Sequence, residues 1–209
     1  MNSHITILKH PLIEHKLAIL RNKDTSNQLF RATLNELSYL LVYEITRDLA
    51  LQPVQIQTPL ATCTARQLAE QILLIPILRA GLGMMDGILD LIPTARVGHI
   101  GVYRDEKTLQ PVEYYCKLPP GAEKMRAFLL DPLLATGGSI IHVASLLKKR
   151  GLSRITVVSI LAAPEGLTAL QAAHPDIQIY SAMLDERLDE HGYILPGLGD
   201  CGDRLFGTI

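Results

Sequence analysis

Apolar and polar residues alternate at helical spacing through the first quarter of the chain. Five apolar residues that lie three or four positions apart form one stripe: Phe30, Leu34, Leu37, Leu41 and Ile45. This spacing predicts a long helix, and Ser26 suits its N-cap. Residues 11–21, which begin at Pro11, predict a shorter helix before it. We therefore expect an N-terminal helical segment.

The rest of the chain consists of short apolar runs separated by helical patterns. The expected strands are residues 54–58, 72–77, 97–103, 112–117, 126–131, 155–161 and 177–182, and the expected helices are residues 82–91, 140–150 and 165–173. This alternation predicts an α/β fold, with an open, twisted and mainly parallel sheet flanked by helices in a single domain over residues 1–209. Ligands of such folds bind beyond the carboxyl ends of the strands, which directs attention to Arg79, Arg104 and Asp131.

The sharpest chemical signal is a loop that leaves an apolar strand and enters a helix. Its residues are Asp131, Pro132, Leu133, Leu134, Ala135, Thr136, Gly137, Gly138 and Ser139. Glycines let main-chain N–H groups approach an anion at a helix start, where the helix dipole favours negative charge. The Gly-Lys-Ser/Thr ending of nucleotide hydrolases is missing. We interpret the loop as a phosphate cradle, against the alternative of an ordinary turn capped by Ser or Thr.

Two further segments carry positive charge after predicted strands. Arg79, with Gly81 and Gly83 close behind it, suits a diphosphate, although an exposed Arg beside a flexible turn would look the same. Residues 103–108 include Arg104 and Lys107 and precede another β-like run. They predict either a mobile β-rich flap that closes over an anionic ligand or a solvated turn.

The C-terminal segment, residues 191–208, is rich in glycine but also apolar. Its apolar residues include Tyr193, Ile194, Leu195, Leu198, Leu205 and Phe206. A disordered tail would be polar, so we expect an ordered loop. Its glycines would expose main-chain N–H and C=O groups to the edge of a flat base. A structural lid without a ligand is the alternative.

Composition narrows the choice of ligand. The formal net charge is −1, so bulk charge attracts neither nucleic acid nor an anionic membrane. Three distant cysteines favour reduced thiols and a cytoplasmic location. The histidines and cysteines have no metal-ligand spacing, and a Gly-x-Ser-x-Gly motif is missing, which argues against a metal held by the protein alone and against a hydrolase triad.

The chain resembles the uracil phosphoribosyltransferase family, within the type I phosphoribosyltransferases, over essentially its whole length. The matching stretches are PILRAGLGMMDG, GVYRDEKTLQPV, DPLLATGGS, AAPEG and EHGYILPGLGDCGDRLFGT. The loop DPLLATGGS marks the wider class, and the glycine-rich tail is specific to the uracil enzymes. The resemblance implies that uracil and 5-phosphoribosyl 1-diphosphate (PRPP) give UMP and diphosphate, a step of pyrimidine salvage. It also implies Mg²⁺ carried with PRPP, a homodimer or homotetramer, and GTP as an activator.

The resemblance assigns roles to individual residues. Residues 131–139 would bind PRPP, with Thr136 to Ser139 on the 5′-phosphate and Asp131 on the ribose hydroxyls. Arg79 and Arg104 would meet the diphosphate. Asp200 would lie near the diphosphate and its Mg²⁺, and Asp131, Arg104 and Asp200 would be catalytic. Ile194 and Gly199 to Cys201, Asp200 included, would contact uracil, largely through main-chain groups.

Two positions depart from the expected pattern. The wider class has two adjacent acids at the end of the strand, whereas Asp131 is followed by Pro132, as in the uracil enzymes. Our hypothesis is that Asp200 replaces the second carboxylate. Cys201 stands where a smaller residue such as Ala is expected. Competing readings are a transferase for a purine or orotate, and an inactive regulator that binds RNA or protein.

Overall fold

The computed structural model describes residues 4–104 and 111–208, with the main chain alone at residues 103, 104 and 111. The helices are α1 (Pro11–Arg21), α2 (Asn27–Ile45), α3 (Leu82–Leu91), α4 (Gly138–Lys149), α5 (Pro164–Ala173) and α6 (Cys201–Phe206), with a 3-10 turn at Ala122–Lys124. The strands are β1 (Ile5–Ile7), β2 (Leu51–Gln57), β3 (Thr62–Leu68), β4 (Ile72–Leu78), β5 (Arg96–Val97), β6 (His99–Arg104), β7 (Pro111–Lys117), β8 (Arg126–Leu130), β9 (Leu133–Leu134), β10 (Ile155–Ala162), β11 (Gln178–Leu184), β12 (Arg187–Leu188) and β13 (Ile194–Leu195).

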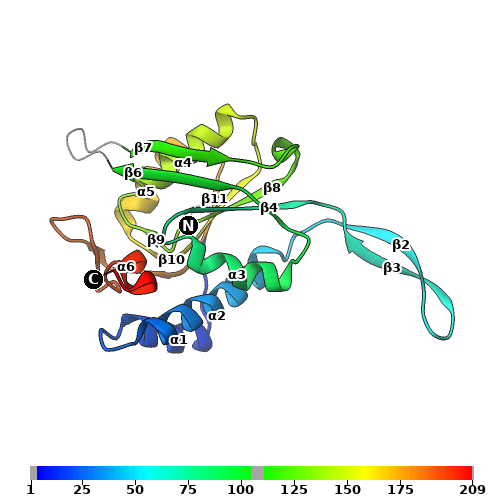
Figure 1. Ribbon diagram of the computed structural model, residues 1–209, viewed down its shortest axis with the longest axis horizontal. Helices are drawn as coiled ribbons and strands as arrows, with labels where there is room; N and C mark the ends of the chain where they lie inside the picture. The colour runs from blue at the N-terminus through cyan, green and yellow to red at the C-terminus, as the bar shows by residue number, and fades with distance from the viewer. Residues whose placement is uncertain (1–3, 105–110, 209) are drawn as a thin grey trace.

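One large sheet organises the molecule (Figure 1). Its strand order is β1-β11-β10-β8-β4-β6-β7, with β5 on β4 and β9 on β10. Every pairing is parallel except that of β6 with β7. The open, mainly parallel sheet predicted from the sequence is therefore confirmed.

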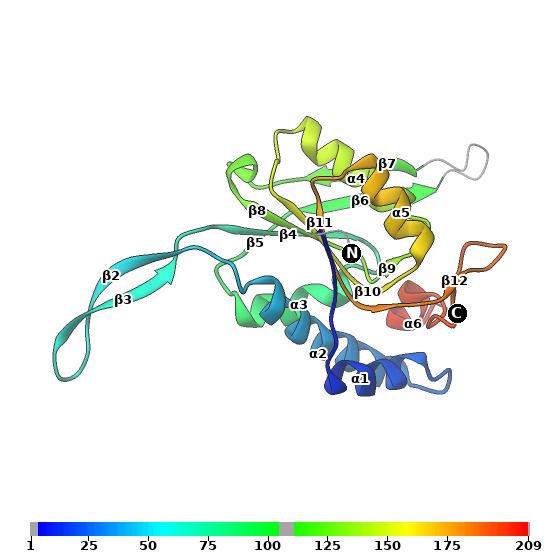
Figure 2. The same ribbon diagram turned by 180° about the vertical axis from the view of Figure 1, so that it is seen from behind.

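Helices cover both faces of the sheet (Figures 1 and 2). The core on one side joins α1, α2, α3 and α6 to alternate residues of β4, β8 and β10, among them Leu74, Phe128 and Val158. The core on the other side joins α4 and α5 to the intervening residues, such as Leu73 and Leu129. Because both faces are buried, β4 and β10 consist almost entirely of buried residues, as parallel strands usually do.

The N-terminal helices match their prediction closely. All five residues of the α2 stripe are fully buried, and the Ser26 side chain accepts a hydrogen bond from the Leu29 amide at 3.3 Å. α1 spans the predicted residues, and so does α3. No helix in residues 4–104 or 111–208 is long and apolar enough to cross a lipid bilayer.

Two antiparallel hairpins extend from this body. β6 and β7 form the predicted β-rich flap, whose tip, residues 105–110, lies outside the described residues. β2 and β3 form a second hairpin that projects far from the sheet (Figures 1 and 2). Only residues 54–58 of it were predicted as a strand, because β3 is polar and exposed along most of its length.

Candidate functional site: two adjoining hollows at the carboxyl edge of the sheet

The predicted phosphate cradle, residues 131–139, connects β8 to α4 at the carboxyl edge of the sheet and is called the phosphate loop below. Gly137 has a left-handed backbone, with φ at +82°, and starts α4 without a side-chain cap. The Gly138 amide donates weakly to the Thr136 hydroxyl at 3.4 Å. A helix usually has a Ser, Thr, Asp or Asn cap, so an uncapped start leaves amide groups for an external anion.

A hollow of about 110 Å³ lies in front of these amides. Its lining residues are Asp131, Leu133, Ala135, Thr136, Gly137, Gly138, Ser139 and Ile140. Two predicted members of the loop, Pro132 and Leu134, are buried instead. The Pro132 carbonyl accepts hydrogen bonds from the amides of Ile160 and Leu161, so this part of the loop is fixed to β10.

Close packing against α5 also shapes the loop. A Cβ on Gly166 would overlap the carbonyl oxygen of Ala135, and one on Gly137 would come within 3.1 Å of the Gly166 carbonyl oxygen. Glycine at position 166 therefore lets α5 approach the loop. This contact explains why the short stretch AAPEG accompanies the loop.

Asp131 stands at the end of β8 in a poorly solvated position. Its Oδ1 accepts a hydrogen bond from the Leu133 amide at 3.4 Å. Burial disfavours the charged form and raises the pKa of Asp131 to about 7, although the Leu133 amide opposes the shift. Near neutral pH this carboxyl can therefore gain or lose its proton when a ligand arrives.

A second hollow, of about 260 Å³, adjoins the first. It is lined by Arg79, Ala80, Asp131, Leu133, Asp200, Cys201 and Gly202. Asp131 and Leu133 line both hollows. Residues from β4, β8 and the C-terminal segment therefore meet at one place, as the sequence predicted.

Arg79 follows β4 after a cis peptide bond and faces α6. Its guanidinium donates to Asp203 Oδ1 at 3.2 Å and to the Thr208 hydroxyl at 3.4 Å, and it stacks on the Phe206 ring. We expected Gly81 and Gly83 to admit an anion. The atoms closest to them belong to the protein instead, since a Cβ on Gly81 would lie 2.5 Å from the Leu130 carbonyl oxygen.

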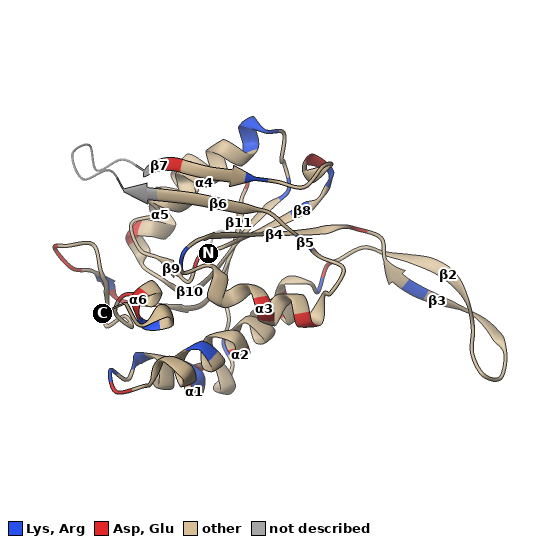
Figure 3. Cartoon of the chain, in the orientation of Figure 1, with Lys and Arg blue, Asp and Glu red and all other residues tan. Residues whose placement is uncertain are grey.

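The C-terminal segment is ordered, but it is not simply a loop. It contains β13, which pairs antiparallel with β12, and the short helix α6, which Asp200 caps through a hydrogen bond from the Asp203 amide at 2.8 Å. α6 carries acidic and basic residues side by side (Figure 3). A Cβ on Gly192 would touch Thr136 at 3.4 Å, so the turn before β13 reaches the phosphate loop.

Some predicted residues lie outside both hollows. Ile194 is buried in the core, and neither it nor Gly199 lines a hollow. The side chains of Arg104 and Lys107 lie outside the described residues. Cys201 lines the second hollow but is only 2% exposed, and burial strongly raises the pKa of its thiol.

The donor set at the second hollow consists of carboxylate oxygens from Asp131 and Asp200. Oxygen is the ligand type that Mg²⁺ prefers. The described residues contain no cluster of three or more His, Cys, Asp or Glu side chains that would hold a metal ion. The two carboxyl groups of the hollow fit a magnesium ion whose other oxygen ligands would come from an anionic substrate.

Comparison with known proteins decides the family. The family model for uracil phosphoribosyltransferase matches residues 7–208. The chain belongs to the uracil phosphoribosyltransferase family. The uracil phosphoribosyltransferase from Latilactobacillus sakei is 57% identical to it, over 97% of this chain and 98% of that protein. The uracil phosphoribosyltransferase from Symbiobacterium thermophilum is also 57% identical, over 99% of both chains.

Solved structures share the fold of this chain. A protein from Aquifex aeolicus is 41% identical, covers 98% of both chains and superposes with a TM-score of 0.90. A hypoxanthine phosphoribosyltransferase from Staphylococcus aureus shares 13% identity and a TM-score of 0.51, over 80% of this chain and 85% of its own. That second likeness supports the fold alone. The uracil phosphoribosyltransferase family and fold inferred from the sequence are thus confirmed.

Sequence reasoning missed several residues of this uracil phosphoribosyltransferase. Asp203 pairs with Arg79, Asp185 pairs with Arg21, and Arg204 donates to three main-chain carbonyl groups. The stretch GDRLFGT contains Asp203 and Arg204, but nothing in its spacing identifies their partners. Those partners lie up to 184 residues away in the sequence.

Proposed function

We propose that this uracil phosphoribosyltransferase divides its substrates between the two hollows. The amides and hydroxyls of Thr136 to Ser139 bind the 5′-phosphate of PRPP in the first. The diphosphate lies in the second, beside Arg79 and Asp200. One observation supports the proposal: Asp131 lines both hollows, so a ribose between the proposed phosphate and diphosphate sites would lie beside it.

The chemistry gives each of these residues a task. The bond at ribose C1 breaks largely before uracil attacks, so positive charge develops on the ring and negative charge on the departing diphosphate. Arg79 and Arg104 stabilise the diphosphate. Asp131 accepts hydrogen bonds from the ribose hydroxyls, which favour its ionised form. Holding the two reactants in line supplies ~7–11 kcal/mol of the barrier reduction, so a covalent nucleophile is unnecessary.

Magnesium completes the site with PRPP. Asp200, with Asp131 nearby, would contact the ion, whose positive charge helps neutralise the diphosphate. Asp200 thereby takes the place of the second acid that Pro132 excludes from the end of β8. The flap of β6 and β7 limits access of water, which would otherwise hydrolyse the activated sugar.

Uracil is read by main-chain groups of residues 199–201, with Ile194 shaping the segment from the core. The burial of Cys201 supports this role, because a residue that is only 2% exposed offers a base little side-chain surface at the hollow. Cys is therefore compatible with uracil binding at a position where Ala is expected. A transferase for orotate would need a cation for the carboxylate of that base, and residues 193–201 contain none.

A base screen tests the activity. Purified protein with Mg²⁺ and PRPP is given uracil, cytosine, hypoxanthine or orotate, and nucleotide formation is followed by chromatography. We expect UMP from uracil and no nucleotide from the other bases. Turnover of another base without uracil would support a different transferase, and inactivity with every base would support a binding protein.

Assembly and regulation rest on the resemblance. We propose a homodimer or homotetramer of single-domain subunits in the cytoplasm, activated by GTP. The β2–β3 hairpin supports assembly, because Leu51, Ile56, Leu60 and Leu68 are exposed on it and a second subunit would bury them. Light scattering would measure the mass, and the base screen with and without GTP would measure activation. A monomer, or an unchanged rate with GTP, would contradict the respective proposal.

A further inference from the structure

The N-terminal helices hold the C-terminal segment that is proposed to read the base. We propose that Arg21, Asp185 and Arg204 are positioning residues that set the main chain of residues 199–201 against uracil. None of the three lines either hollow, so they act through the segment they hold. The inference rests on the proposed uracil site at residues 199–201.

The first contact fixes both main-chain groups of Gly197. Asp185 Oδ2 accepts a hydrogen bond from the Gly197 amide at 3.0 Å, and Arg21 Nη1 donates to the Gly197 carbonyl at 2.8 Å. The same Nη1 donates to Asp185 Oδ2 at 2.8 Å, and Nη2 donates to Asp185 Oδ1. The Asp185 side chain is only 3% exposed, so its charge depends on this two-point pairing.

The second contact fixes the next residue. Arg204 Nη1 donates to the Leu198 carbonyl at 2.8 Å and also to the Leu20 carbonyl, and Nη2 donates to the Asn22 carbonyl at 2.7 Å. Its guanidinium lies 4.4 Å from the centre of the buried Phe30 ring. Arg204 therefore ties the carbonyl before Gly199 to the end of α1.

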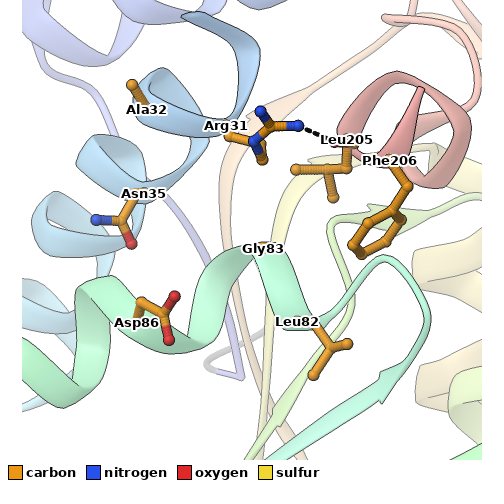
Figure 4. Close-up of a pocket in the computed structure, with 8 residues that line it drawn as sticks. All are labelled: Arg31, Ala32, Asn35, Leu82, Gly83, Asp86, Leu205 and Phe206. Atoms are coloured by element: carbon orange, nitrogen blue, oxygen red, sulfur yellow. Dashed lines mark hydrogen bonds between the residues drawn. The ribbon is translucent and has the colours of Figure 1, made fainter. Parts of the chain in front are cut away.

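The far end of α6 is held by α2 in the same manner. Asn27 donates to the Arg204 carbonyl at 2.8 Å, and Arg31 donates to the Leu205 carbonyl at 2.7 Å. Figure 4 shows the Arg31 bond at the wall of a separate hollow of about 390 Å³ between α2, α3 and α6. Residues 199–201 thus lie between a start fixed to α1 and a helix fixed to α2.

This arrangement matters because a base bound by main-chain groups has no flexible side chain that could adapt to it. If peptide groups read the edge of uracil, their direction depends on the residues that hold them. A guanidinium with several donors in one plane suits this task, and a lysine does not replace it. Loosening these contacts of Arg21, Asp185 and Arg204 should therefore weaken uracil binding more than PRPP binding. Asp200 lies on the same segment, but the loop proposed to bind the 5′-phosphate is held separately by β10 and α5.

The test compares Asp185→Asn and Arg204→Lys with a control from another ion pair, Asp48→Asn. Asp48 also forms a two-point pair, with the buried Arg126, but at the start of β8 and away from both hollows. The readouts are KM for uracil, KM for PRPP, kcat and the melting temperature. We expect the uracil KM of Asp185→Asn and of Arg204→Lys to rise about tenfold or more. Their PRPP KM should rise less than their uracil KM, because the contacts of residues 136–139 and of Arg79 do not depend on these residues.

The control separates positioning from stability. Asp48→Asn should lower the melting temperature and leave the uracil KM unchanged. An unchanged uracil KM in Asp185→Asn, with a loss of stability like that of Asp48→Asn, would overturn the inference. If Asp185→Asn does not fold, the uracil KM of Arg21→Lys is measured instead, since this substitution keeps a positive charge but removes the guanidinium that binds Asp185 and Gly197. Absence of uracil turnover in the wild-type enzyme would instead refute the proposed function.

Discussion

Asp200 accepts a hydrogen bond from the amide of Asp203 at 2.8 Å, and this contact begins α6 inside the hollow that also contains Asp131. The bond uses Oδ1 of the Asp200 carboxylate. One residue therefore has a structural task, capping a helix, and a proposed chemical task, meeting the diphosphate and its magnesium. The two tasks differ in what they require, because a cap needs a side-chain oxygen whereas the chemical task needs a negative charge.

The substitution Asp200→Asn separates these tasks. Asn is as good an N-cap as Asp, so the melting temperature should change little. Loss of the charge should lower kcat/KM for PRPP about a hundredfold. Asp200→Ala is the companion variant, which should lose the cap as well and melt earlier. Near-normal turnover of Asp200→Asn would remove this residue from the site.

Asp131 predicts a pH dependence. Its pKa is raised to about 7 by burial, so the free enzyme changes from mostly protonated to mostly ionised as the pH rises through neutrality. Because the ribose hydroxyls need an acceptor, kcat/KM for PRPP should rise with pH and level off above about 7. The sugar phosphate titrates near about 6, so Asp131→Asn is the control. The rise of kcat/KM near pH 7 should be absent in that variant. If the rise persists, Asp131 is not the group that titrates.

The same carboxyl should cost stability at alkaline pH. An ordinary Asp, as in the unfolded chain, loses its proton near 3.8, while the folded protein keeps the Asp131 proton until about 7. Between those values the folded state holds the extra proton, so raising the pH lowers the free energy of unfolding, by up to ~1.4 kcal/mol per pH unit. Asp131→Asn should therefore melt higher than wild type at pH 8 in calorimetry. A lower melting temperature there would be inconsistent with a carboxyl group whose pKa is raised to about 7 in the folded protein.

Arg79 should matter for PRPP and not for uracil. Its planar group contacts Asp203, Thr208 and the Phe206 ring, and a diphosphate would meet the same fork of donors. Arg79→Lys should raise KM for PRPP about tenfold, since an ammonium group lacks the planar pair of donors with which a guanidinium binds two oxygens side by side. Arg47→Lys, in an exposed pair with Glu44, is the matched control and should leave KM unchanged. Equal effects of the two substitutions would argue against a diphosphate at Arg79.

The three cysteines should differ in reactivity. Cys63 is exposed, Cys116 is half-buried, and Cys201 is buried with a thiol pKa raised by burial. A thiol reagent should therefore label Cys63 first and leave Cys201 unmodified in the native protein. Cys201→Ala should keep the uracil KM within about twofold, because only the main chain at this position is proposed to read the base. A large change in that KM would place the side chain against uracil.

Local patterns were sufficient for the elements that bury an apolar face. The stripe on α2 and the apolar run of β4 have one interpretation each, and the loop after Asp131 combines an acid, two hydroxyl residues and two glycines in a strand-to-helix turn. Those features are determined by neighbouring residues in the sequence. For this reason the fold and the strand-to-helix turn after Asp131 could be predicted.

The hairpin, the last helix and the long-range ion pairs could not be predicted, because they depend on residues that are distant in the sequence or have no clear apolar pattern. β3 is polar and exposed along most of its length, so its hairpin with β2 has no apolar period to reveal it. α6 has only six residues and contains Gly202, which hides its helical character. Asp185 pairs with Arg21 across 164 residues, and Gly81 is packed against Leu130. Such contacts become visible only when the chain is folded.

A crystal structure of the enzyme with UMP, which carries both the 5′-phosphate and the base, would test the two proposed sites together. We expect phosphate oxygens within hydrogen-bond distance of the amides of residues 137–139, and the uracil edge against the main chain of residues 199–201. A phosphate bound instead at Arg79, or a base located away from the C-terminal segment, would contradict the proposed sites.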